Sequence, residues 1–451
     1  MILIDTALEK FAADGGQIRI GVIGAGFMVA GIAHQIRLAH PCMKVCAIAA
    51  RRPDQAVAIL ERDWAKDDIA VAGNRSEIER AIAAGRAAVC EDPADLAAAD
   101  GIDIVLEGTG SMDYALRGVL AALEAVKPVV LMNAELDATV GPLLKVKADA
   151  AGVLISNIDG DQPGVEMNLY RYVKSIGFRP MLCGSVKTLQ DQHRNPETQA
   201  KFAARWTQKV EMVTSFADGT KVAFEQACVA NATGLRVAKR GMIGLDPTGK
   251  DPTLPLRPLE EYVEDLSAHL DLNQPGLVDF VVGARPSPGV FVIGHCDDPD
   301  QQHYMGYYKM GAGPYYLFYT PYHLVHLEVP LTIARVMLFG DAAITPDGAP
   351  SVGVVATAKR PLRAGQTLDG IGGFDTYGEA ENMAPVLDER LLPMGLAEGC
   401  RLKRDVRKDE TLSLDDVDVP AGRRIDELYA EMARHFFDVD IFKQTQTNSA
   451  G

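Results

Sequence analysis

The chain has 451 residues and carries 45 Lys and Arg against 61 Asp and Glu, which gives a formal net charge of −16. This charge argues against a general nucleic-acid binder, because affinity for phosphate backbones requires cationic surface. Hydrophobic residues make up 47% of the chain and charged residues 24%, a composition that excludes a largely disordered protein. The longest apolar runs are far shorter than the roughly 20 residues of a membrane span, so we expect no membrane partner.

The N-terminus and the cysteines indicate the compartment. Residues 1–5 lack the basic residues and the long apolar stretch of a secretory signal. The seven cysteines are scattered, without the close pairs of a zinc site or a disulfide framework. We therefore expect a cytoplasmic protein whose reduced thiols fill the core.

A strand, a glycine turn and a helix follow one another near the N-terminus. Ile18–Ile23 is predicted to form a buried strand, Gly24 and Gly26 form the turn, and Val29–Leu38 has helical periodicity. Alternating strands and helices predict an α/β fold whose N-terminal part is a Rossmann-type, doubly wound parallel sheet. The later strands of this sheet are expected at Lys44–Ala49, Ile102–Glu107, Pro128–Met132 and Val153–Ser156.

The glycine turn predicts a dinucleotide site. Gly24 permits a tight turn, and Gly26 lets a pyrophosphate approach the backbone at the start of the helix, beside Phe27 and Met28. The third glycine of the usual fingerprint is replaced by Val29, which predicts a slightly displaced helix. The alternative is a simple strand-to-helix loop without a ligand.

The ends of the next strands indicate which dinucleotide binds. The second strand runs into Arg51-Arg52 instead of an acidic residue, and two guanidiniums can clamp a 2′-phosphate, so we favour NADP over NAD. A solvated arginine pair is the alternative. The nicotinamide is expected at the carboxyl edge of the sheet. The residues predicted there are Glu107, Gly108, Thr109, Gly110 and Asn133.

The rest of the chain has a different pattern. From about residue 160 to 344 the regular alternation is lost and Gly, Pro and aromatic residues are frequent, which predicts a central α+β domain for substrate and oligomerisation. Residues 358–368 recur 44 residues later as 402–412, which indicates a small β-rich module. We expect domains at 1–158, 159–350 and 351–451. The tyrosine-rich stretch around Tyr315–Tyr319 is typical of a core or of a subunit interface, and on that ground we expect a homo-oligomer.

Four motifs and the repeat carry a family resemblance: residues 157–164, 215–221, 230–234 and 322–328, together with Lys359-Arg360 and Lys403-Arg404. They resemble the homoserine dehydrogenase-like oxidoreductases that have a C-terminal SAF domain. The resemblance covers nearly the whole chain and implies, as one candidate, the activity of the 1-deoxy-D-xylulose 5-phosphate reductoisomerase-like enzymes, which form 2-C-methyl-D-erythritol 4-phosphate with NADPH and a divalent metal. Ordinary homoserine dehydrogenase fits less well, because Ala134 follows Asn133 where that enzyme has lysine.

Four residues are the candidates for catalysis. Hydride transfer to a carbonyl leaves an alkoxide that a lysine can protonate or neutralise. Lys221 follows a turn that contains Asp218, and Glu225 lies one helical turn further on; Lys187 is a second lysine in a loop-like segment. The alternative is an exposed turn with an ion pair between Lys221 and Glu225.

Substrate and metal are expected to bind in the same central region. His193 and Arg194 supply local positive charge for a phosphorylated substrate, and Asn231 and Thr233 either orient its hydroxyls or cap a helix. Mg²⁺ or Mn²⁺ prefers oxygen ligands. The predicted metal ligands are Asp159, Asp161 and Glu166, with His323, His326 and Glu328 as the alternative cluster; in both sets the alternative is solvated or hydrogen-bonded side chains.

These observations predict an NADPH-dependent oxidoreductase that acts on a small, polar, phosphorylated hydroxycarbonyl compound. A dehydrogenase of another sugar acid or of a homoserine-like substrate fits nearly as well. A protein of a different class, a non-catalytic sensor of dinucleotide and carbohydrate, is the third possibility. Turnover of any carbonyl compound would exclude the sensor.

Overall fold

The computed structural model describes residues 3–249, 251 and 253–443, which fall into two compact units. The first unit is formed by the chain up to Asp137, by Leu144–Ser185 and by Pro286–Pro346. The second is formed by Ala138–Leu143, by Val186–Arg285 and by the chain from Asp347 onward. Because these units interleave along the sequence, the division into domains at residues 158 and 350 stays a prediction.

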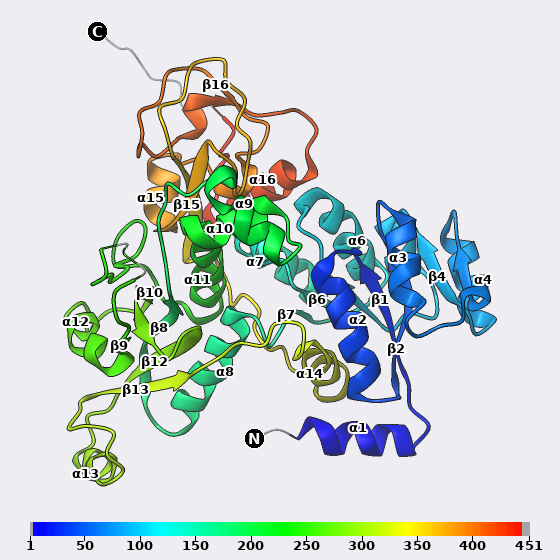
Figure 1. The fold of residues 1–451 in the computed structure, drawn as a ribbon, viewed down its shortest axis with the longest axis horizontal. Helices are drawn as coiled ribbons and strands as arrows, with labels where there is room; N and C mark the ends of the chain where they lie inside the picture. Colours follow the sequence, from blue (N-terminus) through cyan, green and yellow to red (C-terminus); the bar gives the residue numbers. More distant parts are fainter. Residues whose placement is uncertain (1–2, 250, 252, 444–451) are drawn as a thin grey trace. The chain divides into compact units, whose positions relative to one another are not determined.

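A seven-stranded parallel sheet is the centre of the first unit (Figure 1). The strand order is β3-β4-β2-β1-β5-β6-β7, so the order reverses between β1 and β5, and ligands of such sheets bind beyond the carboxyl ends of those strands. The predicted α/β class and doubly wound sheet are confirmed. The strands are β1 (Ile18–Ile23), β2 (Met43–Ala49), β3 (Ile69–Val71), β4 (Ala87–Cys90), β5 (Ile104–Glu107), β6 (Val129–Leu131) and β7 (Ile155–Asn157).

The helices between these strands bury apolar side chains against the sheet. In α2, for example, Val29, Ile32 and Ile36 are at most 1% exposed, and they share one core with Ile20 and Ile48 of the strands. The strands are buried on both faces, which explains their continuous apolar sequences. The helices are α1 (Ile4–Ala13), α2 (Phe27–Ala39), α3 (Pro53–Leu60), α4 (Arg75–Ala83), α5 (Pro93–Ala98), α6 (Met112–Glu124) and α7 (Ala134–Ala151).

A second sheet has the strand order β10-β8-β12-β13. Its strand β8 (Arg179–Lys187) leaves the first unit after Ser185. In the first unit, β12 (Gly289–His295) pairs antiparallel with β13 (Tyr315–Thr320), and α8 (Gln162–Ser175) packs on β12. The same unit also contains α13 (Pro299–Tyr307), α14 (Val329–Ala334) and a π-helical turn at Arg335–Phe339.

The second unit is built around α11 (Thr220–Thr233), a helix with 13 of its 14 residues buried. It packs on β10 (Leu277–Val282) and on the hairpin of β14 (Val352–Ala358) and β15 (Thr376–Asn382). Burial on all sides explains why α11 has no polar face. The unit also holds α9 (Pro196–Arg205), α10 (Val210–Asp218), β9 (Arg257–Pro258), α12 (Val263–Ser267), β11 (Ala284–Arg285), α15 (Met383–Asp388), β16 (Arg401–Leu402), β17 (Val417–Asp418) and α16 (Arg424–Phe437).

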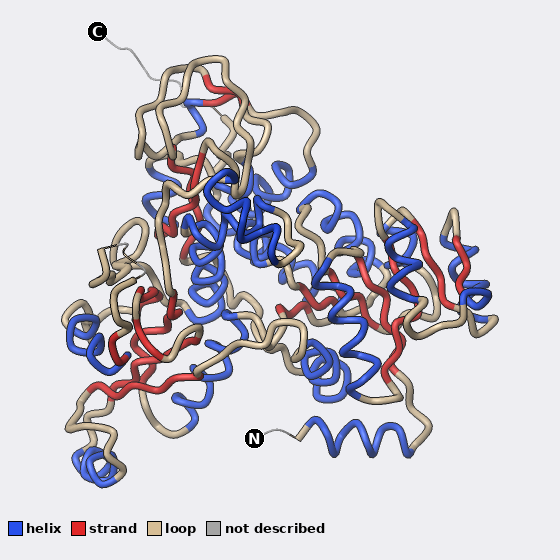
Figure 2. Tube along the Cα trace, in the orientation of Figure 1, coloured by secondary structure: helices blue, strands red, loops and turns tan. Residues whose placement is uncertain are grey.

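The sequence repeat is a structural repeat within the second unit. Leu362 of the first copy and Val406 of the second exchange backbone hydrogen bonds. The hydrogen bond from Asp409 N–H to Ala358 O is matched by the one from Gly365 N–H to Leu402 O, whose donor lies 44 residues earlier and whose acceptor lies 44 residues later. The copies therefore face each other across an approximate two-fold axis, and most of the module is loop joined by short strands (Figure 2).

Two further sequence expectations concern the described residues as a whole. All seven cysteines are buried and unpaired with one another, as expected for core thiols. Across the described ranges, no helix combines the length and the apolar character that a membrane span needs.

Candidate functional site

The glycine turn lies in the first unit, where the strand order reverses. Gly24 follows β1 with φ +115°, a conformation that favours glycine, and a Cβ there would lie 3.0 Å from the carbonyl oxygen of Gly108. Gly26 is the N-cap of α2 and forms no side-chain cap, and a Cβ there would meet nothing within 4 Å. Open space therefore lies beside Gly26 at the start of α2, whose first residues are Phe27 and Met28, and the N-terminus of a helix favours anions.

The two arginines predicted to bind a 2′-phosphate follow the second strand of the same sheet. Arg51 and Arg52 are exposed, and Arg52 is the N-cap of α3. The Arg51 guanidinium lies 5.7 Å from the ring centre of Tyr114. Within the part of the chain that the structure describes, neither arginine forms an ion pair, so both charges are available to an anionic ligand.

The end of β5 contains a buried carboxylate. Oε1 of Glu107 accepts hydrogen bonds from the backbone N–H and the hydroxyl of Thr109, both at 2.7 Å, whereas Oε2 has no partner among the described residues. Burial raises the pKa of Glu107 to about 7, although the Thr109 bonds oppose the shift. The Asn133 amide donates to the Thr109 carbonyl oxygen at 3.1 Å. Of the predicted edge residues, Glu107, Thr109 and Asn133 therefore form one hydrogen-bonded group.

The four predicted catalytic residues lie in the second unit. Lys187 ends β8, and its Nζ lies 3.2 Å from Oε2 of Glu225 on α11. The side chains of Lys187 and Glu225 are 14% and 3% exposed, and Lys221, one helical turn before Glu225, is 9% exposed. Lys187 is thus ion-paired to a buried carboxylate, and Lys221 is buried one helical turn away on the same helix as that carboxylate. The exposed-turn alternative is wrong for this segment, because α11 is buried.

Asp218 is placed differently from the prediction. It ends α10, and its Oδ1 accepts a hydrogen bond from the Thr220 N–H at 2.8 Å. Its Oδ2 lies 2.7 Å from Nζ of Lys359, a residue of the first repeat copy. Burial raises the pKa of Asp218, and the ammonium of Lys359 counteracts that shift. Asp218 therefore anchors the turn before Lys221, and sequence reasoning missed Lys359 as its partner.

The predicted substrate residues are engaged within the fold. His193 Nε2 lies 2.8 Å from Oδ1 of Asp409, and Arg194 pairs with Asp191 at 3.2 Å. Asn231 Oδ1 accepts from the backbone N–H groups of residues 351 and 352, and the Thr233 hydroxyl donates to the carbonyl oxygen one turn earlier in α11. Asn231 and Thr233 therefore bond backbone within the second unit, and their part in binding a substrate stays a prediction.

The predicted metal ligands are not assembled into a site. Asp159 pairs with Arg335 at 2.8 Å, Asp161 is the N-cap of α8, and the buried Glu166 accepts from the Ser185 hydroxyl at 2.8 Å. Among the described residues no group of three His, Cys, Asp or Glu side chains is placed to hold a metal ion. The prediction that these carboxylates form a metal cluster is therefore wrong. Their side chains instead bond to helix α8 and to its neighbours.

The alternative cluster of His323, His326 and Glu328 is not assembled as a metal site either. Residues 322–328 do not form a strand; Val325 makes a single bridge to Gly160, and a turn follows. His326 packs against α2, where a Cβ on Gly31 would lie 3.0 Å from its ring. Glu328 is the N-cap of α14, and burial, with the negative charge of Asp159, raises its pKa.

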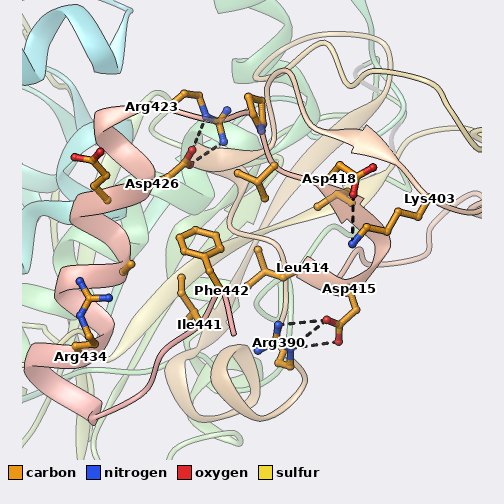
Figure 3. Close-up of a pocket in the computed structure, with 16 residues that line it drawn as sticks. Arg390, Lys403, Leu414, Asp415, Asp418, Arg423, Asp426, Arg434, Ile441 and Phe442 are labelled. Atoms are coloured by element: carbon orange, nitrogen blue, oxygen red, sulfur yellow. Dashed lines mark hydrogen bonds and ion pairs between the residues drawn. The ribbon is translucent and has the colours of Figure 1, made fainter. Parts of the chain in front are cut away.

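A hollow of about 590 Å³ lies in the C-terminal module, and none of the predicted catalytic, cofactor, substrate or metal residues lines it (Figure 3). Lys403, Arg390, Arg423 and Arg434 contribute cations to its wall. Three of these are ion-paired: Arg390 with Asp415 at 3.2 Å, Arg423 with Asp426 at 2.7 Å, and Lys403 with Asp418 at 3.7 Å. Because carboxylates already neutralise most of the wall, we assign the hollow no ligand.

The central part of the chain matches a known enzyme family. Residues 160–329 match the family described as oxidoreductase DRL, catalytic domain. This segment contains Lys187, Lys221 and Glu225, and the match confirms the predicted resemblance to oxidoreductases at that level. It covers less than half of the chain, and the resemblance of the C-terminal module to a SAF domain stays a prediction. No curated protein matches the chain.

Solved structures show only distant likeness. A 1-deoxy-D-xylulose 5-phosphate reductoisomerase from Zymomonas mobilis in complex with NADPH is 16% identical over 47% of this chain and 56% of its own, with a TM-score of 0.35. A homoserine dehydrogenase from Thiobacillus denitrificans is 15% identical over 78% and 83%, with a TM-score of 0.42. A probable dehydrogenase from Thermotoga maritima is 14% identical over 61% and 72%, with a TM-score of 0.34. The chain thus spans little more than half of the reductoisomerase, and at such scores the fold rests on the strand order given above.

Proposed function

We propose that the protein is an NADPH-dependent oxidoreductase that reduces a small, polar, phosphorylated hydroxycarbonyl compound. The observation that carries the proposal is the ion pair of Lys187 with the buried Glu225, with Lys221 buried one helical turn before Glu225, because all three residues lie inside the segment that matches an oxidoreductase catalytic domain. The activity proposed first is that of the 1-deoxy-D-xylulose 5-phosphate reductoisomerase-like enzymes.

The residues of the first unit fit a bound dinucleotide. The open space at Gly26 leaves room for a pyrophosphate against the amides of α2, and Arg51 and Arg52 offer two unpaired charges to a 2′-phosphate. When bound, NADPH supplies the hydride. The residues of this unit would bind and orient the dinucleotide. We propose the preference for NADPH over NADH on the two arginines.

The residues of the second unit supply the polar chemistry. As hydride reaches a carbonyl carbon, the oxygen gains negative charge that must be neutralised. A lysine ammonium does so either as a fixed cation or by donating a proton from Nζ. We assign this role to Lys221, and we assign to Lys187 a charge contact with the substrate phosphate. Glu225, paired to Lys187 at 3.2 Å, holds that lysine in place.

The residues predicted to bind a divalent metal do not fit one as they are placed among the described residues. The carboxylates predicted to bind it, Asp159, Asp161 and Glu166, are engaged within the first unit and are not arranged as a ligand set. No step is therefore assigned to a metal. The assay below still includes Mn²⁺, because a reductoisomerase substrate is rearranged as well as reduced.

The test is an assay of the purified chain with 1-deoxy-D-xylulose 5-phosphate, NADPH and Mn²⁺. We expect loss of the reduced nicotinamide absorbance and formation of 2-C-methyl-D-erythritol 4-phosphate, identified by mass spectrometry. Lys221→Ala should abolish turnover and leave NADPH binding intact. A flat trace rejects this substrate, and a panel of sugar-acid and homoserine-like substrates then tests the dehydrogenase alternative. NADPH binding without turnover of any carbonyl compound would overturn the proposal in favour of a sensor.

A further inference from the structure

Lys359 is a buried lysine of the C-terminal repeat, and its ammonium forms an ion pair inside the second unit. Its side chain is 3% exposed, and its Nζ lies 2.7 Å from Asp218 Oδ2 and donates to the Gly373 carbonyl oxygen at 2.7 Å. A lysine is almost never buried in this way unless its charge is paired. The pair therefore fixes the position of the Asp218 carboxylate.

The anchored carboxylate controls the turn that precedes Lys221. Asp218 ends α10, Gly219 turns the chain with φ +94°, and α11 begins at Thr220. Asp218 Oδ1 accepts from the Thr220 N–H, and the Thr220 hydroxyl oxygen accepts from the Gly378 N–H of β15 at 2.9 Å. The first turn of α11, which carries Lys221, is thus held by contacts that originate in the C-terminal module.

The second repeat copy provides an internal comparison. Lys403 occupies the position equivalent to Lys359, but its side chain is 37% exposed and its ammonium lies 3.7 Å from the Asp418 carboxylate. An exposed pair of this kind contributes little to stability. The repeat therefore provides two lysines of equivalent position, one buried against the Asp218 turn and one on the surface.

We propose that Lys359 is a positioning residue for Lys221: through Asp218 it sets the place of the first turn of α11. This inference rests on the proposed function, because Lys221 is assigned its role there. It gives the C-terminal repeat a part in the reaction that does not require the repeat to contact the substrate. The copy that contains Lys359 acts on the turn, whereas the copy that contains Lys403 does not.

The first test compares matched substitutions in the full-length chain. Lys359→Met should lower kcat at least tenfold and leave the Kd for NADPH within twofold, whereas Lys403→Met should change neither quantity by more than twofold. Lys359→Arg should restore part of kcat, because it keeps a cation beside Asp218. If Lys359→Met does not fold, the double variant Asp218→Asn with Lys359→Met replaces it, since that variant leaves no unpaired buried charge. Unchanged kcat in the folded variants, or equal losses at Lys359 and Lys403, would overturn the proposal.

The second test needs no substrate. Trace acetylation with acetic anhydride, read by peptide mass spectrometry, reports how reactive the Lys221 amine is relative to exposed Lys174. We expect the relative labelling of Lys221 to rise at least threefold in Lys359→Met and to stay unchanged in Lys403→Met. If the wild-type chain turns over no carbonyl compound but this shift occurs, the proposed function fails and the positioning by Lys359 stands. If labelling is unchanged while the wild-type chain is active, the positioning fails alone.

Discussion

Arg51 and Arg52 differ from most arginines of this chain in having no carboxylate partner within the described ranges. A guanidinium binds phosphate through charge-assisted hydrogen bonds, so these two residues should act on the 2′-phosphate that distinguishes NADPH from NADH. We expect each substitution by alanine to weaken NADPH binding by roughly 1–3 kcal/mol and to leave NADH binding largely unchanged. Fluorescence titration with both coenzymes measures the difference. Equal losses for the two coenzymes would show that the arginines do not recognise the phosphate.

Glu107 predicts a pH dependence of stability. Its pKa rises from 4.5 to about 7 on folding because the carboxyl is buried. Between these values the folded state binds more protons than the unfolded state, so ionisation of Glu107 lowers the free energy of unfolding as the pH rises through this window. Glutamine keeps an acceptor for Thr109 and does not titrate. We therefore expect Glu107→Gln to gain stability relative to wild type from pH 4.5 to 7, by at most roughly 3 kcal/mol.

Urea unfolding of both proteins across that pH range measures the gain. Other titrating groups, such as the buried Asp279 with its pKa raised to about 6, are present in both chains and cancel in the difference. A difference in stability that does not change with pH would mean that Glu107 is ionised in the folded protein throughout the range.

At the scale of one element, the turn between β1 and α2 separates two roles of glycine. Gly24 needs its positive φ and its contact with Gly108, so Gly24→Ala should lower the thermal midpoint. Gly26 has φ −84° and free space where a Cβ would be. Gly26→Ala should therefore leave the thermal midpoint nearly unchanged and weaken NADPH binding at least tenfold. Unchanged binding in Gly26→Ala would show that no pyrophosphate approaches this helix.

The same element shows why part of the fold could be predicted from sequence. Strand β1 is a run of branched apolar residues that ends in the glycine turn, and both signals are local. Strands β3 and β4 escaped prediction, because Ile69–Val71 has only three residues and Ala87–Cys90 begins with alanines, which favour strands weakly. Tertiary packing in the sheet, not local preference, makes these segments extended.

The candidate site was less predictable than the fold. The ion pair of Lys359 with Asp218, which are 141 positions apart, could not be predicted from the sequence, and neither could that of Arg335 with Asp159. No local sequence pattern indicates a buried ion pair between distant residues. The density of acidic residues at 159–166 indicated a metal site, but in the fold each carboxylate bonds to a protein group: an arginine, a helix N-terminus or a serine hydroxyl. The repeat was visible in sequence, whereas the different burial of Lys359 and Lys403 follows from which copy packs on α10 and α11.

At the scale of the whole molecule, helix α13 bears on the proposal that copies of the chain associate. The helix has no buried residue, and Tyr304, Tyr307 and Tyr308 are 60%, 76% and 66% exposed. A cluster of solvent-exposed aromatic side chains is typical of a protein contact surface, because each of them buries a large apolar area on association. We expect a homo-oligomer in which α13 contributes to the interface.

Light scattering coupled to size-exclusion chromatography tests this expectation. The wild-type chain should have at least twice the mass of one copy, and the double substitution Tyr307→Ser with Tyr308→Ser should lower the mass toward one copy. Phe202→Ser provides the control, since Phe202 is 54% exposed on α9, away from α13 in the sequence. A single-copy mass for wild type rejects association. If the double tyrosine variant still has the mass of several copies, the interface lies on another surface, because the area that the tyrosines bury is then not what holds the copies together.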